Sequence, residues 1–337
     1  MGNLFDNMLK GDESIFLNPE HLDYSYQPKL VPFRENQQFY IASCIKPLFD
    51  KRDGKSLLVH GIQGIGKTLC CKHILKELQE ETDDVFIIYI NSWIDETAYK
   101  ITLDICNQIG YKWVADKNTK DLIDEIASII NKKSAVIVFD EFDKIQDYGI
   151  LYSLLEKIYK KTIILITNDA GSIRKLEPRI MSRLNLDRLE FKPYDFNETK
   201  EILKTRKNYA FVRDVFDEDA FEAITIKTFE LKDIRKGLFL LKEAGNIAEE
   251  ESFRRVTLKH AEYAIKKAGE FNDLKIFKSD ESNVLELFNR NPGKSLKEMY
   301  EIYRADNNKS YKTFQRVVHR LSEAKSIDLR KNNSKTI

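Results

Sequence analysis

The stretch GIQGIGKT, residues 61–68, decides which fold this chain adopts. It follows the apolar run SLLVH at 56–60 and leads into LCCKHIL at 69–75, which is compatible with a helix. A full match to Gly-x4-Gly-Lys-Thr between a strand and a helix predicts a phosphate-binding loop. Backbone N–H groups of the loop and of the helix N-terminus would face the phosphates. The expected nucleotide contacts are Gly61, Ile62, Gln63, Gly64, Ile65, Gly66, Lys67, Thr68 and Leu69.

The side chains that would carry the chemistry lie in the loop and after a second apolar run. Lys67 would reach the β and γ phosphates, and Thr68 would offer its hydroxyl to Mg²⁺. Asp140 and Glu141 directly follow the run AVIVF at 135–139. Asp140 would hold the metal through water while Glu141 polarises the attacking water. ATP and Mg²⁺ are therefore the expected cofactors, and Glu141 favours hydrolysis over kinase-type or simple switch chemistry.

Three further polar positions extend this set. Asn168 ends the run TIILIT at 162–167 and could orient the water, although an Asn at a strand end is more often a turn former. Arg179 and Arg183 lie one helical turn apart, and either could project into a neighbouring subunit's nucleotide as an arginine finger. Arg235, in KDIRKGLF at 232–239, could reach back to the γ phosphate from a second domain.

The apolar runs also predict the architecture. VFIIYIN at 85–91, AVIVFDEFD at 135–143, TIILITN at 162–168 and the weaker RLEFKPY at 188–194 are typical of buried parallel strands joined by helices. The strand pattern stops after Pro193, and residues 196–268 are helical by pattern, with Asn197 and Thr257 as expected N-caps. The predicted domains are an α/β core at 1–195 with a lead-in at 1–50, a helical lid at 196–272 and a basic module at 283–337.

Composition excludes several other classes of protein. The 337 residues carry a formal net charge of only +1, so overall charge indicates no partner. The four cysteines, at 44, 70, 71 and 106, form no CxxC pair, which argues against a zinc site and fits a reducing, intracellular compartment. No run approaches the roughly 18 apolar residues of a membrane span. We expect a cytoplasmic, nucleoid-associated protein without a membrane partner.

In this order the motifs resemble those of AAA+ ATPases. Residues 140–156, 166–184 and 191–206 are similar to the archaeal origin-recognition and cell-division-control type replication initiators, and the resemblance runs from about residue 20 to about 270. The lead-in at 22–37 helps form the adenine pocket in that family, which implies roles for Leu30 and Val31, with Tyr194 and Arg206 also at the nucleotide. Residues 89–110 resemble the family's helical insertion, which touches origin DNA.

The resemblance implies a function as well as a fold. It implies ATP binding, slow hydrolysis, binding of origin duplex DNA, self-association on DNA, and recruitment or loading of a minichromosome-maintenance helicase. Three departures stand out. Residues 233–237 keep the arginine that the family has in its lid, here Arg235, but only part of the family's small-residue pattern. Both Arg179 and Arg183 are candidates for the arginine finger. The chain is also shorter than most of the family at its C-terminal end.

The C-terminal segment has its own charge balance. Residues 290–337 hold twelve Lys or Arg and five Asp or Glu, a net of +7, which leaves the rest of the chain at −6. This charge is typical of a DNA-contacting module. The resemblance implies a C-terminal winged-helix DNA-binding domain, whose three helices could be formed by three stretches of this segment. The alternative is a solvated basic face on a lid or oligomerisation module, and the last eleven residues leave little room for a wing. The candidate DNA contacts are Lys309, Tyr311, Lys312, Arg316, Arg320, Arg330 and Lys331.

Two other functions fit the same motifs. One is a clamp-loader-like or transposition-helper AAA+ ATPase, in which the partner differs. The other is an ATP-dependent switch with a C-terminal protein-interaction module.

Overall fold

The computed structural model describes residues 14–276, 284, 287–288, 291, 294–306 and 311–323, with side chains at 270–276, 305–306 and 320–323 left aside. The chain divides into two compact units, residues 1–262 and 263–337, which are treated one at a time. None of the described helices is long and apolar enough to cross a bilayer.

A parallel five-stranded sheet forms the centre of the first unit, in the order β2-β3-β4-β1-β5. The strands are β1 (Leu57–His60), β2 (Val85–Asn91), β3 (Ser134–Asp140), β4 (Lys161–Thr167) and β5 (Asp187–Glu190). Every residue of β3 and β4 is buried, as expected of central strands that helices cover on both faces. The prediction of an α/β core with a parallel sheet is confirmed. β5 is shorter than its predicted range, since its pairing with β1 ends at His60 and Glu190, and this edge strand alternates between partly buried and exposed residues.

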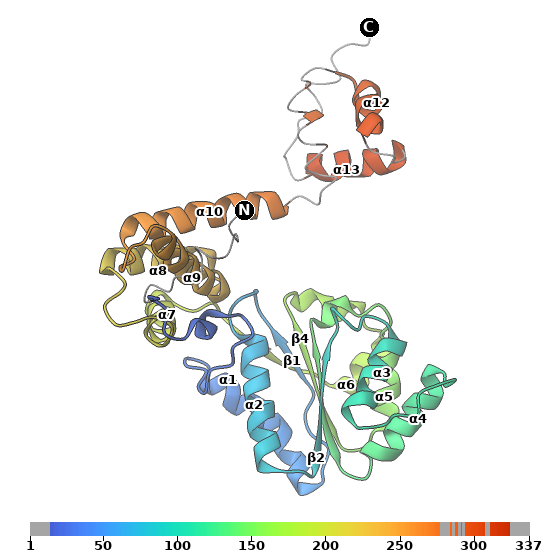
Figure 1. Cartoon of the computed structure of the whole chain (residues 1–337). Coiled ribbons are helices and arrows are strands. Elements are labelled where there is room, and N and C mark those ends of the chain that lie inside the picture. Colours follow the sequence, from blue (N-terminus) through green and yellow to red (C-terminus); the bar gives the residue numbers. More distant parts are fainter. Residues whose placement is uncertain are drawn as a thin grey trace, which may run out of the picture. The chain divides into compact units, whose positions relative to one another are not determined.

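Helices cover both faces of the sheet (Figure 1). They are α1 (Glu35–Ile45), α2 (Lys67–Glu81), α3 (Ala98–Gln108), α4 (Thr119–Ile130), α5 (Gly149–Lys157) and α6 (Pro178–Leu184). Successive residues of a strand point to opposite faces. Val136 and Val138 therefore pack in the apolar cluster with α1 and α2, whereas Ile137 and Phe139 pack in the one with α3 to α6.

A helical part follows the sheet. Its elements are α7 (Phe196–Ala210), α8 (Glu218–Leu231), α9 (Ile234–Glu250) and α10 (Leu258–Ile276). α7 starts with a capping box, in which the Asp195 carboxylate accepts from the Glu198 amide and the Glu198 carboxylate accepts from the Asp195 amide. The prediction of Asn197 as the cap is therefore wrong, since Asn197 lies inside the helix. Thr257 directly precedes α10.

The lead-in is shared between the helical part and the sheet. Its first half holds a short 3-10 helix at Pro19–Leu22 and packs on the helical part: the Phe16 and Phe211 rings lie 4.6 Å apart, and Lys242 pairs with Asp23 at 2.6 Å. From Arg34 onward the chain belongs to the layer of α1. Residues 27–33 thus cross from one part to the other.

The second unit holds α12 (Leu296–Asp306) and α13 (Tyr311–Glu323). Their apolar cluster contains Val284, Phe288, Met299, Tyr303, Phe314, Val317 and Val318. Most of the first expected helix, and all of the segment expected to hold a wing, lie outside the described residues. The winged-helix assignment therefore stays a prediction.

Candidate functional site

The phosphate loop lies at the carboxyl end of β1 and runs directly into α2. Gly64 and Gly66 have φ values of 76° and 90°, in the left-handed region that glycine tolerates best. The loop forms one wall of a cavity of about 860 Å³ that the lead-in and the helical part also line. The first backbone N–H groups of α2 lack helical partners, so this wall is suited to an anion.

Lys67 is the cation at the base of the loop and is only 6% exposed. Its ammonium donates to the carbonyls of Gly61 at 2.8 Å and Ile62 at 2.7 Å, and to Asn168 Oδ1 at 2.8 Å. Burial lowers the pKa of Lys67 to about 8, and the nearby carboxylates of Glu141 and Asp140 oppose that shift. A phosphate group would supply the counter-charge that this ammonium lacks.

The Asp140 carboxylate is held from three directions and is 5% exposed. Its Oδ2 accepts from the Thr68 hydroxyl at 2.9 Å and from the Tyr89 hydroxyl, and its Oδ1 accepts from the Glu141 amide at 3.0 Å. Burial and the Asp140 charge raise the pKa of Tyr89 far above its usual range. Tyr89 therefore stays a donor to Asp140.

Glu141 and Asn168 meet at the ends of neighbouring strands β3 and β4. Asn168 Nδ2 donates to Glu141 Oε2 at 2.8 Å, while its Oδ1 accepts from Lys67. One amide side chain thus bridges the loop lysine and the candidate water-polarising carboxylate. Sequence placed these three residues in separate motifs, and the structure brings them together.

The residues present fit a magnesium nucleotide. The Thr68 hydroxyl donates a hydrogen bond to Asp140, which leaves the lone pairs of the hydroxyl oxygen free for a cation. Mg²⁺ binds through one or two protein oxygens together with phosphates and waters. A cluster of three acidic or other ligating residues is accordingly not needed, and the described residues contain none.

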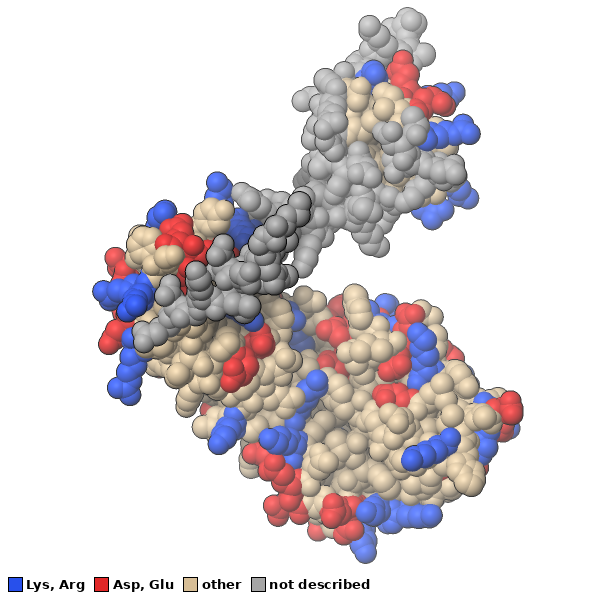
Figure 2. Space-filling model, viewed as in Figure 1, with Lys and Arg blue, Asp and Glu red and all other residues tan. Residues whose placement is uncertain are grey.

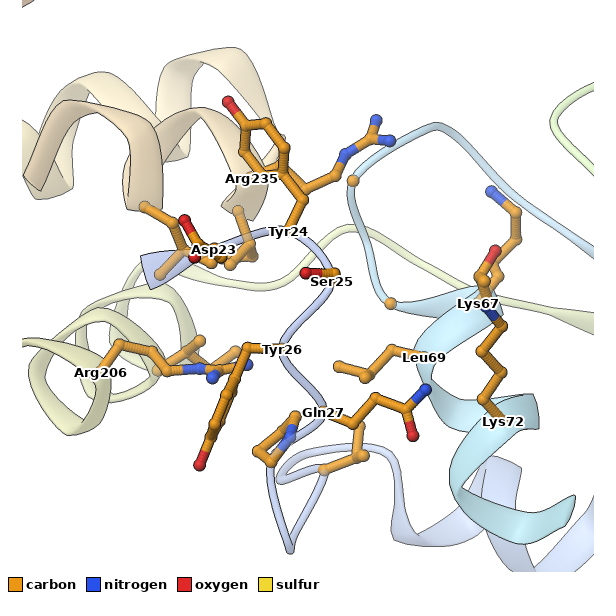
Figure 3. A pocket seen from close by; sticks show the side chains of 18 of the residues that line it. Asp23, Tyr24, Ser25, Tyr26, Gln27, Lys67, Leu69, Lys72, Arg206 and Arg235 are labelled. Atoms are coloured by element: carbon orange, nitrogen blue, oxygen red, sulfur yellow. The ribbon is translucent and has the colours of Figure 1, made fainter. Parts of the chain in front are cut away.

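The other expected nucleotide contacts line the same cavity, namely Leu30, Val31, Tyr194 and Arg206. Arg206 is 8% exposed, and its guanidinium donates to the His21 carbonyl at 3.3 Å and lies 5.0 Å from the Tyr26 ring centroid. In Figure 3, Arg206 and Tyr26 lie across the pocket from Lys67 and Lys72. An aromatic ring, a buried cation and apolar side chains at this end suit a planar base.

Two hydrophobic residues of the loop contribute no side chain to this cavity. Ile62 is 43% exposed, and Ile65 is 1% exposed beneath the loop. Their expected nucleotide contacts are thus limited to backbone groups.

Arg235 lines the cavity but points its guanidinium at its own helix cap. It pairs with Asp233 through Nη2 at 3.1 Å and Nε at 3.2 Å. The backbone of this turn also contacts the phosphate loop, since the Ile234 amide donates to the Gly64 carbonyl at 3.1 Å. Asp233 was not singled out from sequence, because its position depends on how the helical part docks.

Arg179 and Arg183 lie on the surface, away from the side chains that line the cavity. Arg179 pairs with Glu177 at 2.6 Å, and Arg183 lies 3.8 Å from Glu156. Both guanidinium groups pack on the ring of Tyr152, at 5.0 and 4.8 Å. Neither reaches the site of its own chain, so only a second subunit could use them.

Arg34 is a functional candidate that sequence reasoning missed. The residue is 4% exposed, and its guanidinium donates to the carbonyls of Ile65 and Lys192 and lies 3.8 Å from the Tyr194 ring centroid. It thereby ties the lead-in to the underside of the phosphate loop. Nothing in the pattern around FREN at 33–36 indicates this, because the three partners are remote in sequence.

The basic candidates of the second unit are only partly described. Lys312 and Arg316 are exposed and four residues apart on α13, so they share a face. Tyr311 is half-buried against Tyr300, with ring centroids 4.9 Å apart. Lys309, Arg330 and Lys331 lie outside the described residues, as does the side chain of Arg320.

Comparison with known proteins agrees with this geometry. Residues 50–172 match the AAA domain family, and residues 200–266 match the Cdc6 AAA+ ATPase-type lid domain. The ORC1-type DNA replication protein of Pyrococcus horikoshii is 32% identical over 285 residues, which is 77% of this chain and 67% of that protein. The chain belongs to the ORC1-type DNA replication proteins.

A second relative and a solved structure support the same assignment of family and fold. The ORC1-type DNA replication protein 1 of Sulfurisphaera tokodaii is 32% identical over 279 residues, which is 78% of this chain and 70% of that protein. The structure of the Aeropyrum pernix ORC1 protein in complex with DNA has a TM-score of 0.78 at 23% identity and covers 93% of this chain and 89% of that one. This likeness supports the fold: an AAA+ domain followed by a helical lid, as predicted.

Proposed function

We propose that this chain binds ATP, hydrolyses it slowly, and uses the nucleotide state to control its affinity for duplex DNA at a replication origin. The observation that carries the proposal is the hydrogen-bonded set Lys67–Asn168–Glu141 beside Thr68–Asp140. The proposed domains are a core at 1–195, a lid at 196–272 and a DNA-binding module at 283–337. The family supports an ATPase in general, and the set of side chains supports the assignment of roles.

In this proposal Lys67 neutralises charge on the β and γ phosphates, and Thr68 and Asp140 hold the metal. Bound Mg²⁺ supplies charge neutralisation and orientation of the phosphates. Glu141 takes up the proton of the attacking water, and Asn168 fixes the carboxylate orientation through the 2.8 Å hydrogen bond. Arg179 or Arg183 of a second copy completes the site when chains associate on DNA.

Arg235 makes the lid sensitive to the nucleotide. Its present partner is Asp233, whose side chain lies against Gly64 of the phosphate loop. A γ phosphate competes with that carboxylate for the guanidinium, whereas ADP lacks the competing group. The exchange would change how the lid helix α9 is held, and this supports nucleotide-dependent DNA binding.

Charge distribution supports the second unit as the principal DNA contact. Over the face of the sheet domain seen in Figure 2, Lys and Arg are interspersed with Asp and Glu. Residues 290–337, by contrast, carry a net charge of +7. Contacts between cations and phosphates release counterions, so such binding is strong and salt-dependent. Recruitment of a minichromosome-maintenance type helicase is proposed from the family alone.

Duplex DNA binding of the full chain tests the proposal. We expect Kd to rise steeply with salt, and expect deletion of 283–337 to remove most of that dependence. An unchanged slope after the deletion would reject the basic module. Crosslinking to genomic DNA tests the origin assignment, and enrichment away from origins would favour a clamp-loader-like or transposition-helper role instead. Loss of ATP binding in Lys67→Ala tests the loop.

A further inference from the structure

Tyr89 occupies a place in the nucleotide site that the proposed chemistry does not use. It lies on the edge strand β2, where it pairs in register with Val138 of β3, and Asn91 pairs with Asp140. Residues two apart on a strand point to one face of the sheet. Tyr89 and Asp140 are thus diagonal neighbours on the same face, at a separation that a long side chain can span.

The phenol meets Asp140 at the oxygen that also receives Thr68. Asp140 Oδ2 accepts from both hydroxyls, and Oδ1 accepts from the Glu141 amide. An ionised carboxylate has about four acceptor positions. Three are taken by the protein, so the plane of the carboxylate is fixed and about one position is left, on a residue that lines the cavity.

Tyr89 is itself anchored by the end of α3. The Tyr89 amide donates to Gln108 Oε1 at 2.8 Å, and the Tyr89 carbonyl accepts from Gln108 Nε2 at 2.8 Å. This side-chain amide takes the place of a neighbouring strand at the open edge of the sheet. The ring itself lies near a cation, with Lys72 Nζ 4.6 Å from its centroid.

We propose that Tyr89 is a positioning residue, whose hydroxyl holds the Asp140 carboxylate in the orientation that binds the magnesium nucleotide. In the same proposal, Gln108 links this orientation to helix α3. The inference rests on the proposed nucleotide site. Residues that orient a metal-binding carboxylate change metal affinity about 10–100-fold when they are removed. A coupling between α3 and Asp140 follows, because the two Gln108 hydrogen bonds fix the backbone from which the phenol projects.

The test is Tyr89→Phe, which removes one oxygen and keeps the ring. Binding of a fluorescent non-hydrolysable ATP analogue, an N-methylanthraniloyl adenylyl imidodiphosphate, is measured in EDTA and across a Mg²⁺ titration. We expect equal affinity in EDTA. We expect the Mg²⁺ concentration for the half-maximal gain in affinity to rise about tenfold or more in the variant.

Tyr40→Phe is the matched control, because the Tyr40 hydroxyl donates to the Asp187 carboxylate at 3.0 Å outside the site. A purely structural role would give both variants the same lowered melting temperature and an unchanged Mg²⁺ titration. That unchanged titration in Tyr89→Phe would overturn the positioning role. If the wild-type chain binds the analogue neither with Mg²⁺ nor with EDTA, the nucleotide assignment fails as well.

Gln108→Ala tests the tie to α3. We expect the Mg²⁺ midpoint to move in the same direction as in Tyr89→Phe, by a smaller factor, since the phenol remains. A midpoint equal to that of the wild type would remove α3 from the proposal.

Discussion

The amide of Ile234 donates to the carbonyl of Gly64 at 3.1 Å, so a backbone hydrogen bond joins the lid to the phosphate loop. The Asp233 side chain lies over the same glycine. A Cβ at Gly64 would come within 1.9 Å of Asp233 Oδ1 and 2.8 Å of its Cα. The loop and the lid are therefore in contact before any phosphate is considered, at a point where only glycine fits.

We predict that Gly64→Ala destabilises the chain and weakens ATP binding. The left-handed backbone costs an alanine about 1 kcal/mol, and the overlap with Asp233 adds about 1–3 kcal/mol. Gly110→Ala is the control, because Gly110 has a similar φ of 78° and nothing within 4 Å of an added Cβ. Urea unfolding and nucleotide titration measure both variants. Equal losses of unfolding free energy and of nucleotide affinity in the two variants would show that the contact between Gly64 and the lid contributes to neither quantity.

The depressed pKa of Lys67 predicts pH-dependent nucleotide affinity. In the nucleotide-free chain, burial lowers the pKa of Lys67 to about 8. Bound phosphates would raise this pKa because they stabilise the ammonium. Binding then takes up a proton above pH 8, so affinity is steady below pH 8 and falls as pH rises beyond it.

Nucleotide titrations between pH 7 and 9.5 measure this effect. Lys67→Arg is the control, because arginine stays protonated throughout, and any affinity it retains should not change with pH. A wild-type affinity that is constant to pH 9.5 would contradict the prediction.

Glu141→Gln should separate binding from hydrolysis. We expect ATP affinity within about threefold of the wild type and turnover lowered about 10²-fold or more, since the amide cannot take up the proton of water. Single-turnover hydrolysis measures it. Glu80→Gln, at an exposed pair 4.0 Å from Lys76, should leave both quantities unchanged. Undiminished turnover in Glu141→Gln would remove Glu141 from the chemistry.

Arg34→Ala should lower the free energy of unfolding more than most single substitutions do. Its loss leaves the buried carbonyl of Ile65 and the partly buried carbonyl of Lys192 without this donor and removes the cation from the Tyr194 face, at about 2–4 kcal/mol together. Arg52→Ala, at an exposed pair with Asp50, should cost less than about 0.5 kcal/mol. Chemical denaturation compares the two, and similar midpoints would show that Arg34 is not a structural tie.

Lys312→Ala and Arg316→Ala should each weaken duplex DNA binding. If each cation neutralises one phosphate, the slope of log K against log salt falls by about 0.9 for each substitution, whatever the DNA sequence. Lys76→Ala, on α2 of the first unit, serves as the control. Slopes equal to that of the wild type would place the DNA contact elsewhere.

The sequence predicted what depends on short patterns. The apolar runs located β2, β3 and β4, and the residues at the carboxyl ends of parallel strands share one edge, which brings Asp140 and Asn168 to the loop. Tyr89 was missed because its reach to Asp140 depends on strand register. Asp233 and Arg34 were missed because their partners are distant in sequence, at Gly64 and at Ile65 and Lys192.

The shared lead-in has a mechanical consequence. The first described residues pack against α7 and α9, the chain then passes to the sheet through residues 27–33, and it returns to the lid between β5 and α7. Two covalent segments therefore join the lid to the sheet, and residues 27–32 of the first and Tyr194 of the second line the nucleotide cavity. A change in the position of the lid would thus act on the cavity walls from two sides.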